Sequence, residues 1–472
     1  MNAIIGRTAE AEKLNGIKSN KKSDLVAVYG RRRIGKTFLI RACFEKEIVF
    51  EITGLYRATT KDQIENFTNE LNKRIGEPSS PKKIKNWLTA FKELGAYIDS
   101  LSSKKKKVIF IDEFPWMATS RSKFLMAFEN FWNQYATRRA DLIVVICGSA
   151  ASYMVQKIIK NKGGLHNRIS ETIRLLPFNL QETGMYLRSR GVKYTNYDVA
   201  QLYMCIGGVP HYLEKIKKEE SIAQNIDRLC FSKNGDLYNE FNQLYASLFD
   251  NSEKHLQLVK TLAKNLKGIS RNELIEKSGL SSGGDTSLKL EELIQSGFVE
   301  DFTFYQNKKQ LTLYRLIDEY SLFYLKYIVT NKKNGNGTWI NLHKSQSFKA
   351  WCGYSFENIC LKHIFCLKRA LGIAGIYSNN NSWFNKNAQI DLLIDRDDNV
   401  MNVCEMKFYN SAYTITKQDY LNLKNKVNEL QKETKTRKTI FITFITTFGI
   451  QQNEYSNELV RNSIVLDDLF KG

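Results

Sequence analysis

The sequence predicts an α/β protein whose N-terminal part is built on a parallel sheet. Helical stretches long enough for crossover connections separate the apolar segments of this part, as parallel strands require. A second, smaller α/β segment follows a Lys-, Asn- and Gly-rich linker at 332–337. The expected strands, short and apolar, are 25–29, 47–52, 107–111 and 142–147.

Composition restricts the class of protein. The chain has 472 residues, of which 43% are hydrophobic, so we expect about three packed domains rather than a disordered chain. No apolar run approaches the roughly 18 residues of a membrane helix, and the first ten residues do not resemble a secretory signal. The eight cysteines are scattered without a CxxC pair. These features predict a cytoplasmic protein with reduced core thiols and no membrane partner.

The charge balance indicates a polyanionic partner. The net charge is +21, from 70 basic and 49 acidic residues, and most of the excess precedes residue 341. Such a balance favours DNA, because each phosphate contact releases counterions. A lysine-rich surface produced by composition alone is the alternative, and the sequence leaves both open.

The character of the chain changes three times along its length. After residue 175 the strands stop and the pattern becomes helical. A helix, a turn, a second helix and a hairpin then follow one another between 271 and 304, which is the order of a winged helix. The domain limits expected from these changes are 1–174, 175–245, 246–333 and 340–472.

A glycine-rich loop with the pattern GxxxxGK[ST] lies between the first strand and a helix. Its glycines let backbone N–H groups surround phosphates, and the helix N-terminus adds partial positive charge. In this interpretation Lys36 reaches the β- and γ-phosphates and the Thr37 hydroxyl binds Mg²⁺. The loop therefore predicts binding of ATP with Mg²⁺. Its residues, with the first one of the following helix, are Gly30, Arg31, Arg32, Arg33, Ile34, Gly35, Lys36, Thr37 and Phe38.

The three arginines of this loop are not needed for nucleotide affinity if the backbone holds the phosphates. Their side chains are then expected to point away from the phosphates. They could contact nucleic acid or a neighbouring domain, or only balance local charge.

A second element of the same site follows the third strand. Asp112 and Glu113 stand where a buried strand ends, which is the Walker B arrangement. Asp112 is expected to hold the magnesium through water, and Glu113 to orient and deprotonate the attacking water. Ser149, after the next strand, is a candidate sensor of the γ-phosphate, although a plain helix N-cap is the alternative.

These motifs together resemble the prokaryotic "archaeal ATPase" family of the AAA+/STAND P-loop ATPases. The resemblance covers about residues 1–330 and includes a helical lid and a winged helix. It depends on Ile5-Gly6-Arg7, the phosphate-binding loop, Ile109 to Pro115, Cys147 to Ala150, Leu175 to Phe178 and Gly207 to Leu213.

The resemblance implies further site residues. Gly6 and Arg7 would lie near the adenine, and Pro210 would approach it from the lid, although Gly-Gly-Val-Pro could be only a helix-breaking turn. Arg168 matches the family's candidate arginine finger, acting in cis or in trans within an ATP-dependent homo-oligomer, but could be one more surface cation. Thr8 departs from the acidic residue often found there.

The C-terminal segment carries a separate group of carboxylates. Two strands, 389–395 and 400–408, flank a turn and predict a hairpin. Counting from the turn places Asp391 opposite either Cys404 or Glu405, and a three-residue loop selects Glu405. Glu405 and Lys407 then share one face of the strand. Two carboxylates with a lysine are suited to bind a divalent cation and a phosphodiester, although Glu-x-Lys is also common as a solvated pair.

Glu357, on a preceding amphipathic helix, could supply a third carboxylate to this metal site. The layout resembles the PD-(D/E)XK restriction-endonuclease-like fold over about residues 345–472, with Ile390 in place of the name-giving proline. The histidines His255, His343 and His363 are isolated and are interpreted as structural.

The sequence thus predicts an ATPase that switches conformation and is coupled to DNA binding, with a tail that cleaves phosphodiesters in the presence of metal. One alternative is a regulatory switch with an inactive nuclease-like tail. Another is a ring-forming motor.

Overall fold

The computed structural model describes residues 4–76, 84–103, 105–119, 121–160, 163–249, 251–305 and 312–471. Its contacts divide the chain into two compact units. The first unit comprises Met1–Leu176 with Ser247–Asp250 and Glu291–Gly297, and the second comprises the remainder.

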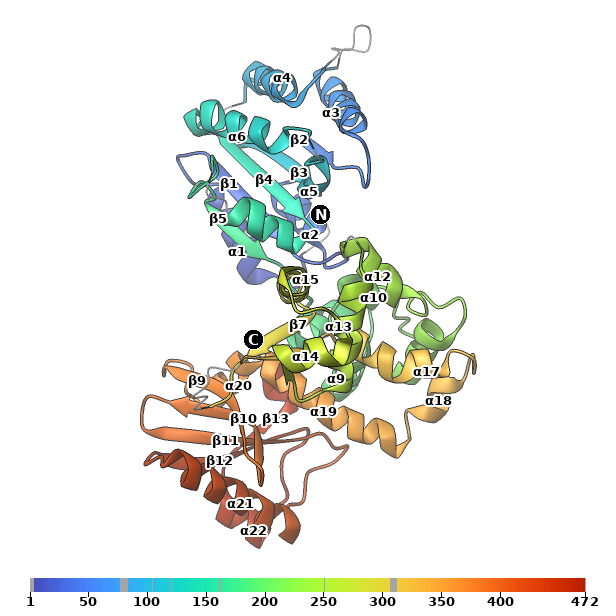
Figure 1. Ribbon diagram of the computed structural model, residues 1–472, viewed down its shortest axis with the longest axis vertical. Coiled ribbons are helices and arrows are strands. Elements are labelled where there is room, and N and C mark those ends of the chain that lie inside the picture. Colours follow the sequence, from blue (N-terminus) through green and yellow to red (C-terminus); the bar gives the residue numbers. More distant parts are fainter. Residues whose placement is uncertain are drawn as a thin grey trace. The chain divides into compact units, whose positions relative to one another are not determined.

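The first unit is built on a five-stranded parallel sheet with the order β2-β3-β4-β1-β5 (Figure 1). The parallel sheet and the four strands predicted from apolar segments are confirmed. The fifth strand was missed because it is short and has a single fully buried residue, Ile173. The strands are β1 (Asp24–Tyr29), β2 (Ile48–Thr53), β3 (Lys107–Asp112), β4 (Leu142–Gly148) and β5 (Glu171–Arg174).

Helices cover both faces of this sheet because its central strands are apolar on both sides. Alternate residues of β4 belong to two different clusters: Val144 and Ile146 face one, and Ile143 and Val145 face the other. The helical segments are α1 (Thr8–Ile17), α2 (Lys36–Phe44), α3 (Thr60–Ile75), α4 (Trp87–Ser100), α5 (Phe114–Met117), α6 (Phe124–Gln134), η1 (Ala136–Arg138), α7 (Ala151–Tyr153) and η2 (Met154–Ile159).

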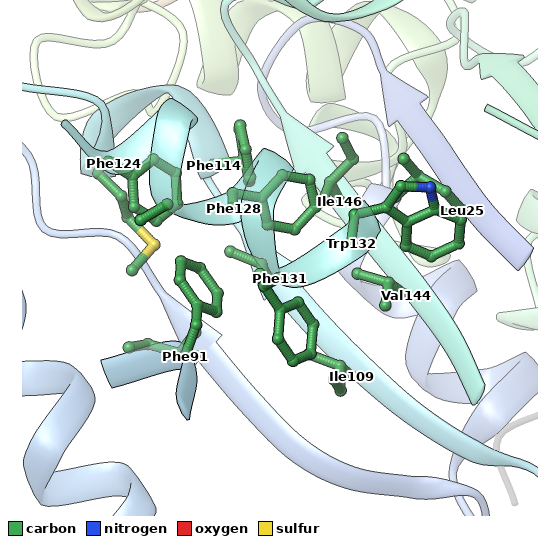
Figure 2. Close-up of a cluster of buried hydrophobic side chains, with 14 of the residues drawn as sticks. Leu25, Phe91, Ile109, Phe114, Phe124, Phe128, Phe131, Trp132, Val144 and Ile146 are labelled. Carbon is green, nitrogen blue, oxygen red and sulfur yellow. The ribbon is translucent and has the colours of Figure 1, made fainter. Parts of the chain in front are cut away.

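The larger cluster is rich in aromatic rings (Figure 2). Phe91 of α4 stacks on Phe131 of α6 at a centroid distance of 5.2 Å, and both belong to the same cluster as Ile109 of β3. Burying one such ring contributes roughly 2–3 kcal/mol. The cluster therefore fixes α4 and α6 on the face of the sheet opposite to α1 and α2.

The second unit begins with helices, as predicted for the segment after residue 175. Residues 177–246 contain no strand among those the structure describes. The helices are α8 (Leu180–Ser189), α9 (Asn196–Ile206), α10 (Pro210–Leu213), α11 (Ile222–Ile226), η3 (Asp227–Phe231) and α12 (Glu240–Leu248).

A small three-stranded sheet follows, with the order β6-β8-β7. Helix, strand, two helices and two strands succeed one another, which is the order of a winged helix and confirms that part of the predicted fold. The tip between β7 and β8 lies outside the described residues. The elements are α13 (Glu253–Lys264), β6 (Ile269–Ser270), α14 (Arg271–Ser278), α15 (Gly284–Gln295), β7 (Val299–Phe302) and β8 (Leu313–Leu316).

The C-terminal part contains a separate five-stranded sheet with the order β13-β12-β11-β10-β9. Strands β9, β10 and β11 are antiparallel neighbours, whereas β11, β12 and β13 run parallel. The strands are β9 (Ser378–Phe384), β10 (Gln389–Arg396), β11 (Val400–Lys407), β12 (Thr439–Thr446) and β13 (Val460–Val465). The helical segments of this part are α16 (Glu319–Phe323), η4 (Tyr324–Ile328), α17 (Val329–Asn331), α18 (Thr338–Leu342), α19 (Gln346–Lys362), α20 (Ile364–Ala370), α21 (Lys417–Thr434), α22 (Glu454–Leu459) and η5 (Leu466–Phe470).

Two expectations from composition can be compared with the structure. All eight cysteines are buried and free of disulfides, as predicted. Among the described residues, none of the helices has the length and apolar character needed to cross a membrane.

His363 joins two helical segments of the second unit. Its Nε2 accepts a hydrogen bond of 3.0 Å from the backbone N–H of Leu180, and its Nδ1 bonds the carbonyl of Ile359 at 2.7 Å. The first bond requires an unprotonated Nε2. Burial lowers the pKa of His363 to about 4 from its ordinary value of 6.5. The histidine is structural, in agreement with the sequence-based interpretation.

We expect acid to destabilise the second unit through His363. The folded state binds fewer protons than the unfolded state between pH 6.5 and 4, so stability falls as the pH falls through this window. The loss should reach about 2 kcal/mol at pH 5. Urea denaturation at several pH values would measure it. His363→Asn should abolish most of this dependence, whereas His343→Asn should retain it. A dependence unchanged in His363→Asn contradicts the assignment.

Candidate functional site

The phosphate-binding loop connects β1 to α2 in the first unit. Gly30 has φ of +151°, and a Cβ there would lie 2.2 Å from the carbonyl oxygen of Leu175. Gly35, immediately before the helix, has φ of +88°. The buried side chain of Ile34 lies between these glycines and anchors the loop in the apolar cluster of β1 and α2. Only glycine fits at Gly30, because the backbones of the loop and of residue 175 meet there.

Lys36 is buried inside the loop, with 6% of its surface exposed. Its Nζ donates to the carbonyl oxygens of Gly30 at 2.8 Å and Arg31 at 2.9 Å. The ammonium group is therefore held at the N-terminus of α2, where backbone N–H groups are unpaired by the helix itself.

The Thr37 hydroxyl bonds a carboxylate from another strand. Its Oγ1 donates to Oδ2 of Asp112 at 2.6 Å, and the other oxygen of Asp112 accepts the backbone N–H of Glu113 at 2.9 Å. Asp112 is almost fully buried, with 5% exposed. A hydroxyl and a carboxylate side by side form the oxygen donor set that Mg²⁺ prefers. The residues present thus fit a magnesium ion, which Thr37 would bind directly and Asp112 through water, as the sequence predicts.

Glu113 and Ser149 contact each other directly. Oε2 of Glu113 accepts both the backbone N–H of Ser149, at 3.0 Å, and its hydroxyl, at 2.7 Å. Glu113 has φ of +46°, a left-handed conformation that costs roughly 1–2 kcal/mol in a non-glycine residue. The sequence predicted both residues for one site, but their hydrogen bond was not expected.

Two further glycines allow the strand ends to approach. A Cβ on Gly148, at the end of β4, would lie 2.8 Å from Cδ of Pro115. A Cβ on Gly54, after β2, would lie 2.7 Å from the carbonyl oxygen of Glu113. Gly54 thus lies against the backbone of Glu113, and Gly148 lies against the side chain of Pro115, two residues further along the chain.

The three arginines of the loop have different environments. Arg31 is buried, whereas Arg33 is exposed. Arg32 lies over the rings of Trp116, at 4.7 Å from its centroid, and Tyr56, at 5.6 Å. The sequence analysis missed both aromatic residues. The position of Trp116 three residues after Glu113 was the available signal.

Arg7 precedes α1 and forms a hydrogen bond to the phosphate-binding loop. Its Nη2 donates to the carbonyl oxygens of Ile34 at 3.3 Å and Leu176 at 2.6 Å. Gly6 precedes it with φ of +67°, so both residues form the turn before α1. These contacts give Arg7 a structural role. The contact with adenine stays a prediction.

Three other predicted residues, Phe38, Arg168 and Pro210, lie in different environments. Phe38 is 46% exposed and lines a cavity of about 470 Å³ together with Thr37. Arg168 lies on an exposed turn before β5. Pro210 opens α10 and belongs to the second unit. The roles of Arg168 and Pro210 stay predictions.

The carboxylates of the C-terminal sheet lie on the β10–β11 hairpin. Asp395 pairs with Met401 and Leu392 with Cys404, and three residues separate the end of β10 at Arg396 from the start of β11 at Val400. The three-residue loop is therefore confirmed. The register ends at Leu392 with Cys404, so the position of Asp391 opposite Glu405 stays a prediction.

Glu405 is held by two lysines. Its Oε1 lies 3.0 Å from Nζ of Lys407, as the shared face predicted, and its Oε2 lies 2.8 Å from Nζ of Lys426 on α21. Burial by itself raises the pKa of Glu405, but the two ammonium groups bring it below its ordinary value. Lys426 was missed, because its helix is amphipathic and lysine-rich and gave no separate signal.

Glu357, from α19, lines a cavity of about 350 Å³ together with Asp391 and Lys426. Burial, and then the negative charges of Asp391 and Glu405, raises the pKa of Glu357 to about 8. Lys267, from the loop before β6, reaches the same cavity and bonds the side chain of Gln389. The cavity thus combines carboxylates with ammonium and amide groups.

The described residues contain no group of three or more His, Cys, Asp or Glu side chains arranged to hold a metal ion. In the structure both oxygens of Glu405 are in ion pairs with lysines. The donors expected for a metal in the tail are therefore near one another but are not arranged as a metal cluster.

We expect Gly30→Ala to destabilise the first unit by at least about 2 kcal/mol, because its Cβ would overlap the carbonyl oxygen of Leu175. Gly16→Ala is the matched control. Gly16 lies in α1 with no neighbouring atom within 4 Å of the added Cβ, so alanine should be neutral or stabilise by up to about 1 kcal/mol. Thermal unfolding measures both. Equal melting temperatures for the two variants contradict the close approach.

The part of the chain that contains this first site is similar to a known protein family. Residues 5–216 match the model of a family described as an ATPase domain predominantly from Archaea. Residues 324–422 match a second model, described as archaeal and bacterial proteins of unknown function. An uncharacterized protein of Methanocaldococcus jannaschii is 22% identical over 400 residues, which cover 84% of each chain.

Solved structures with similar folds include a Walker-type ATPase of Pyrococcus abyssi. It has a TM-score of 0.46 and 16% identity and covers 68% of this chain and 96% of its own. The ORC2 protein of Aeropyrum pernix, solved with ADPNP and ADP, has a TM-score of 0.43 and 17% identity, covering 70% and 94%. The segment 5–216, which contains Lys36, Thr37, Asp112, Glu113 and Ser149, is thus similar to an archaeal ATPase domain.

Proposed function

We propose that the first unit binds and hydrolyses ATP with Mg²⁺ and that this cycle switches the conformation of the chain. The observation that carries the proposal is the 2.6 Å hydrogen bond between Thr37 and Asp112, next to the buried ammonium group of Lys36. Carboxylate, hydroxyl and ammonium group meet at the N-terminus of one helix. The match of residues 5–216 to an ATPase family supports the same conclusion.

The loop would hold the phosphates mainly through its backbone. The unpaired N–H groups at the start of α2 point toward the loop, and the helix adds partial positive charge there. Lys36 is held within hydrogen-bonding distance of two loop carbonyls, so it is oriented toward the place where the β- and γ-phosphates would lie. Mg²⁺, when bound to Thr37 and through water to Asp112, would neutralise phosphate charge.

Glu113 would act as the general base on the attacking water. Its Oε2 is fixed by Ser149, which leaves Oε1 without a bond in this pair and places the carboxylate beside the end of β4. Ser149 would exchange its hydroxyl between Glu113 and the γ-phosphate, so that the base becomes mobile only when the nucleotide is complete. This exchange would connect sensing to hydrolysis.

The remaining assignments extend this site by resemblance. Gly6, Arg7 and Pro210 would contact the adenine side, and Arg168 would act as an arginine finger in cis or from another copy in an ATP-dependent oligomer. The exposure of Arg168 is compatible with the second case. The eight buried free thiols are in keeping with a reducing, cytoplasmic location.

We expect Lys36→Ala to weaken ATP binding at least tenfold, an effect of about 1.4 kcal/mol or more, because the phosphates lose a buried cation. Glu113→Gln should lower the turnover rate by about 100-fold or more and change affinity little. Binding of a fluorescent ATP analogue and release of phosphate would measure the two effects. Lys46→Ala, an exposed lysine of the same unit, is the control for lost charge. Normal turnover in Glu113→Gln contradicts its role as base.

A four-part organisation goes with this function. The ATPase core (1–174) and helical lid (175–245) would bind nucleotide, and the winged helix (246–333) and tail (340–472) would respond to it. DNA is the proposed partner, since the net charge of +21 favours a polyanion. The three-stranded sheet and helices of residues 253–316 support the winged-helix part of this division.

Phosphodiester cleavage by the tail is a second proposed activity. Asp391 would lie opposite Glu405, one step beyond the pair of Leu392 with Cys404, Glu357 lines the adjoining cavity, and Lys407 lies 3.0 Å from Glu405. The carboxylates would hold a divalent cation, and the lysines would stabilise the charge that develops on the phosphate. The alternative is an inactive nuclease-like module that binds DNA. The two ion pairs that occupy Glu405 favour this alternative.

Cleavage of single- and double-stranded DNA, with Mg²⁺ or Mn²⁺ and with or without ATP, separates these possibilities. If the tail is a nuclease, Glu405→Ala/Lys407→Ala should abolish cleavage, because both the metal ligand and the cation are lost. Glu458→Ala/Lys424→Ala removes an exposed ion pair of 2.7 Å from the same sheet domain and should cut normally. Absence of cleavage in the wild-type chain, with ATP turnover intact, favours the inactive module.

A further inference from the structure

Arg32, Tyr56, Arg57 and Trp116 form a contiguous cluster of cations and rings, which we call the platform. Arg32 lies 4.7 Å from the centroid of Trp116, and Trp116 lies 5.2 Å from Tyr56. Arg57 covers Tyr56 at 5.1 Å. All four residues belong to the first unit. Basic and aromatic groups thus alternate along one surface of that unit.

The platform is exposed rather than part of the core. Tyr56 is 44% exposed and Arg57 is exposed, whereas Arg32 and Trp116 are partly buried. The two aromatic rings lie at the surface beside two guanidinium groups. Their contact with water is unfavourable, and they do not fill the core. The apolar cluster of this unit contains neither ring among its buried members.

A buried amide holds the two loops that carry the rings. The side chain of Gln63, which is fully buried, donates to the carbonyl oxygens of Leu55 at 2.7 Å and Trp116 at 3.0 Å and accepts the N–H of Leu55 at 3.0 Å. The close approach of Gly54 to Glu113 fixes the same loops. The loop geometry therefore does not depend on the exposed rings, and the platform is preorganised.

The backbone of Arg57 adds an independent observation. Its φ of +54° lies in the left-handed region, where glycine or asparagine is favoured and other residues cost roughly 1–2 kcal/mol. A large cation occupies this position all the same and lies over the ring of Tyr56.

We propose that the platform binds single-stranded nucleic acid. Exposed rings stack on unpaired bases, and the arginines contact phosphates or stack in their turn. A duplex keeps its bases stacked internally and cannot offer them to the rings, so the chemistry selects single strands. The proposal names the site and form of the nucleic-acid partner suggested by the positive charge. The inference rests on the proposed ATPase function only where it links the platform to the neighbouring nucleotide site.

The location connects this surface with the nucleotide site. Arg32 belongs to the phosphate-binding loop itself, and Trp116 follows Glu113 by three residues in the chain. A base stacked on the platform would therefore contact both segments that form the ATP site.

Fluorescence anisotropy of labelled oligodeoxythymidylate, with the full-length chain, tests the proposal. Tyr56→Ala/Arg57→Ala should raise the Kd about tenfold or more, because stacking of one base is worth about 1–3 kcal/mol. Neither residue belongs to the phosphate-binding loop, and both are exposed, so folding and ATP binding should be retained. The control Phe365→Ala/Arg369→Ala removes another exposed ring with an arginine over it and should keep the wild-type Kd.

A second measurement does not depend on these variants. Stacking on the platform should quench the fluorescence of Trp116, so the quenching by oligonucleotide should be smaller in Trp116→Phe than in the wild-type chain. An unchanged Kd in Tyr56→Ala/Arg57→Ala, an equal loss in the control, or equal competition by duplex overturns the proposal. Binding of the ATP analogue, measured on the same samples, shows separately whether the nucleotide site is intact.

Discussion

The geometry of the nucleotide site depends on close packing at the carboxyl ends of three parallel strands. Gly30, Gly54 and Gly148 follow or end β1, β2 and β4, and a Cβ on any of them would lie under 3.0 Å from a neighbouring atom. The register of the sheet brings the strand ends to one edge, and the missing Cβ at these three positions lets backbone or side-chain atoms approach. The 2.6 Å bond between Thr37 and Asp112 and the contact of Glu113 with Ser149 lie at this edge.

The sequence was sufficient for the parts that depend on local pattern. Lys36, Thr37, Asp112 and Glu113 could be assigned because a parallel sheet brings its strand ends to one edge, so order along the chain determines proximity. The bond of Glu113 to Ser149 could not, because it depends on rotamers and on a left-handed backbone. Tyr56 was missed for a related reason: it lies on a loop whose position is fixed by the distant, buried Gln63.

The C-terminal hairpin shows what counting along the sequence can predict and what it cannot. Its three-residue loop could be counted from the sequence, and the strand ends at Arg396 and Val400 agree with that count. What counting could not give is charge compensation from another element. Lys426 reaches Glu405 from α21, so the carboxylate has two cationic partners instead of one. An ammonium group and a divalent cation compete for the same oxygens, so the chemistry of this site depends on which of them Glu405 prefers.

The phosphate-binding loop illustrates how one short segment can serve several surfaces. If backbone N–H groups hold the phosphates, as proposed, the side chains of Arg31, Arg32 and Arg33 would not be constrained by the nucleotide. They occupy three environments: buried, stacked on Trp116, and exposed to solvent. A change in the loop that accompanies binding or loss of the γ-phosphate would move Arg32 relative to rings held by Gln63. The same residues would therefore transmit the state of the nucleotide to the surface beside it, without any contact between the arginines and the phosphates.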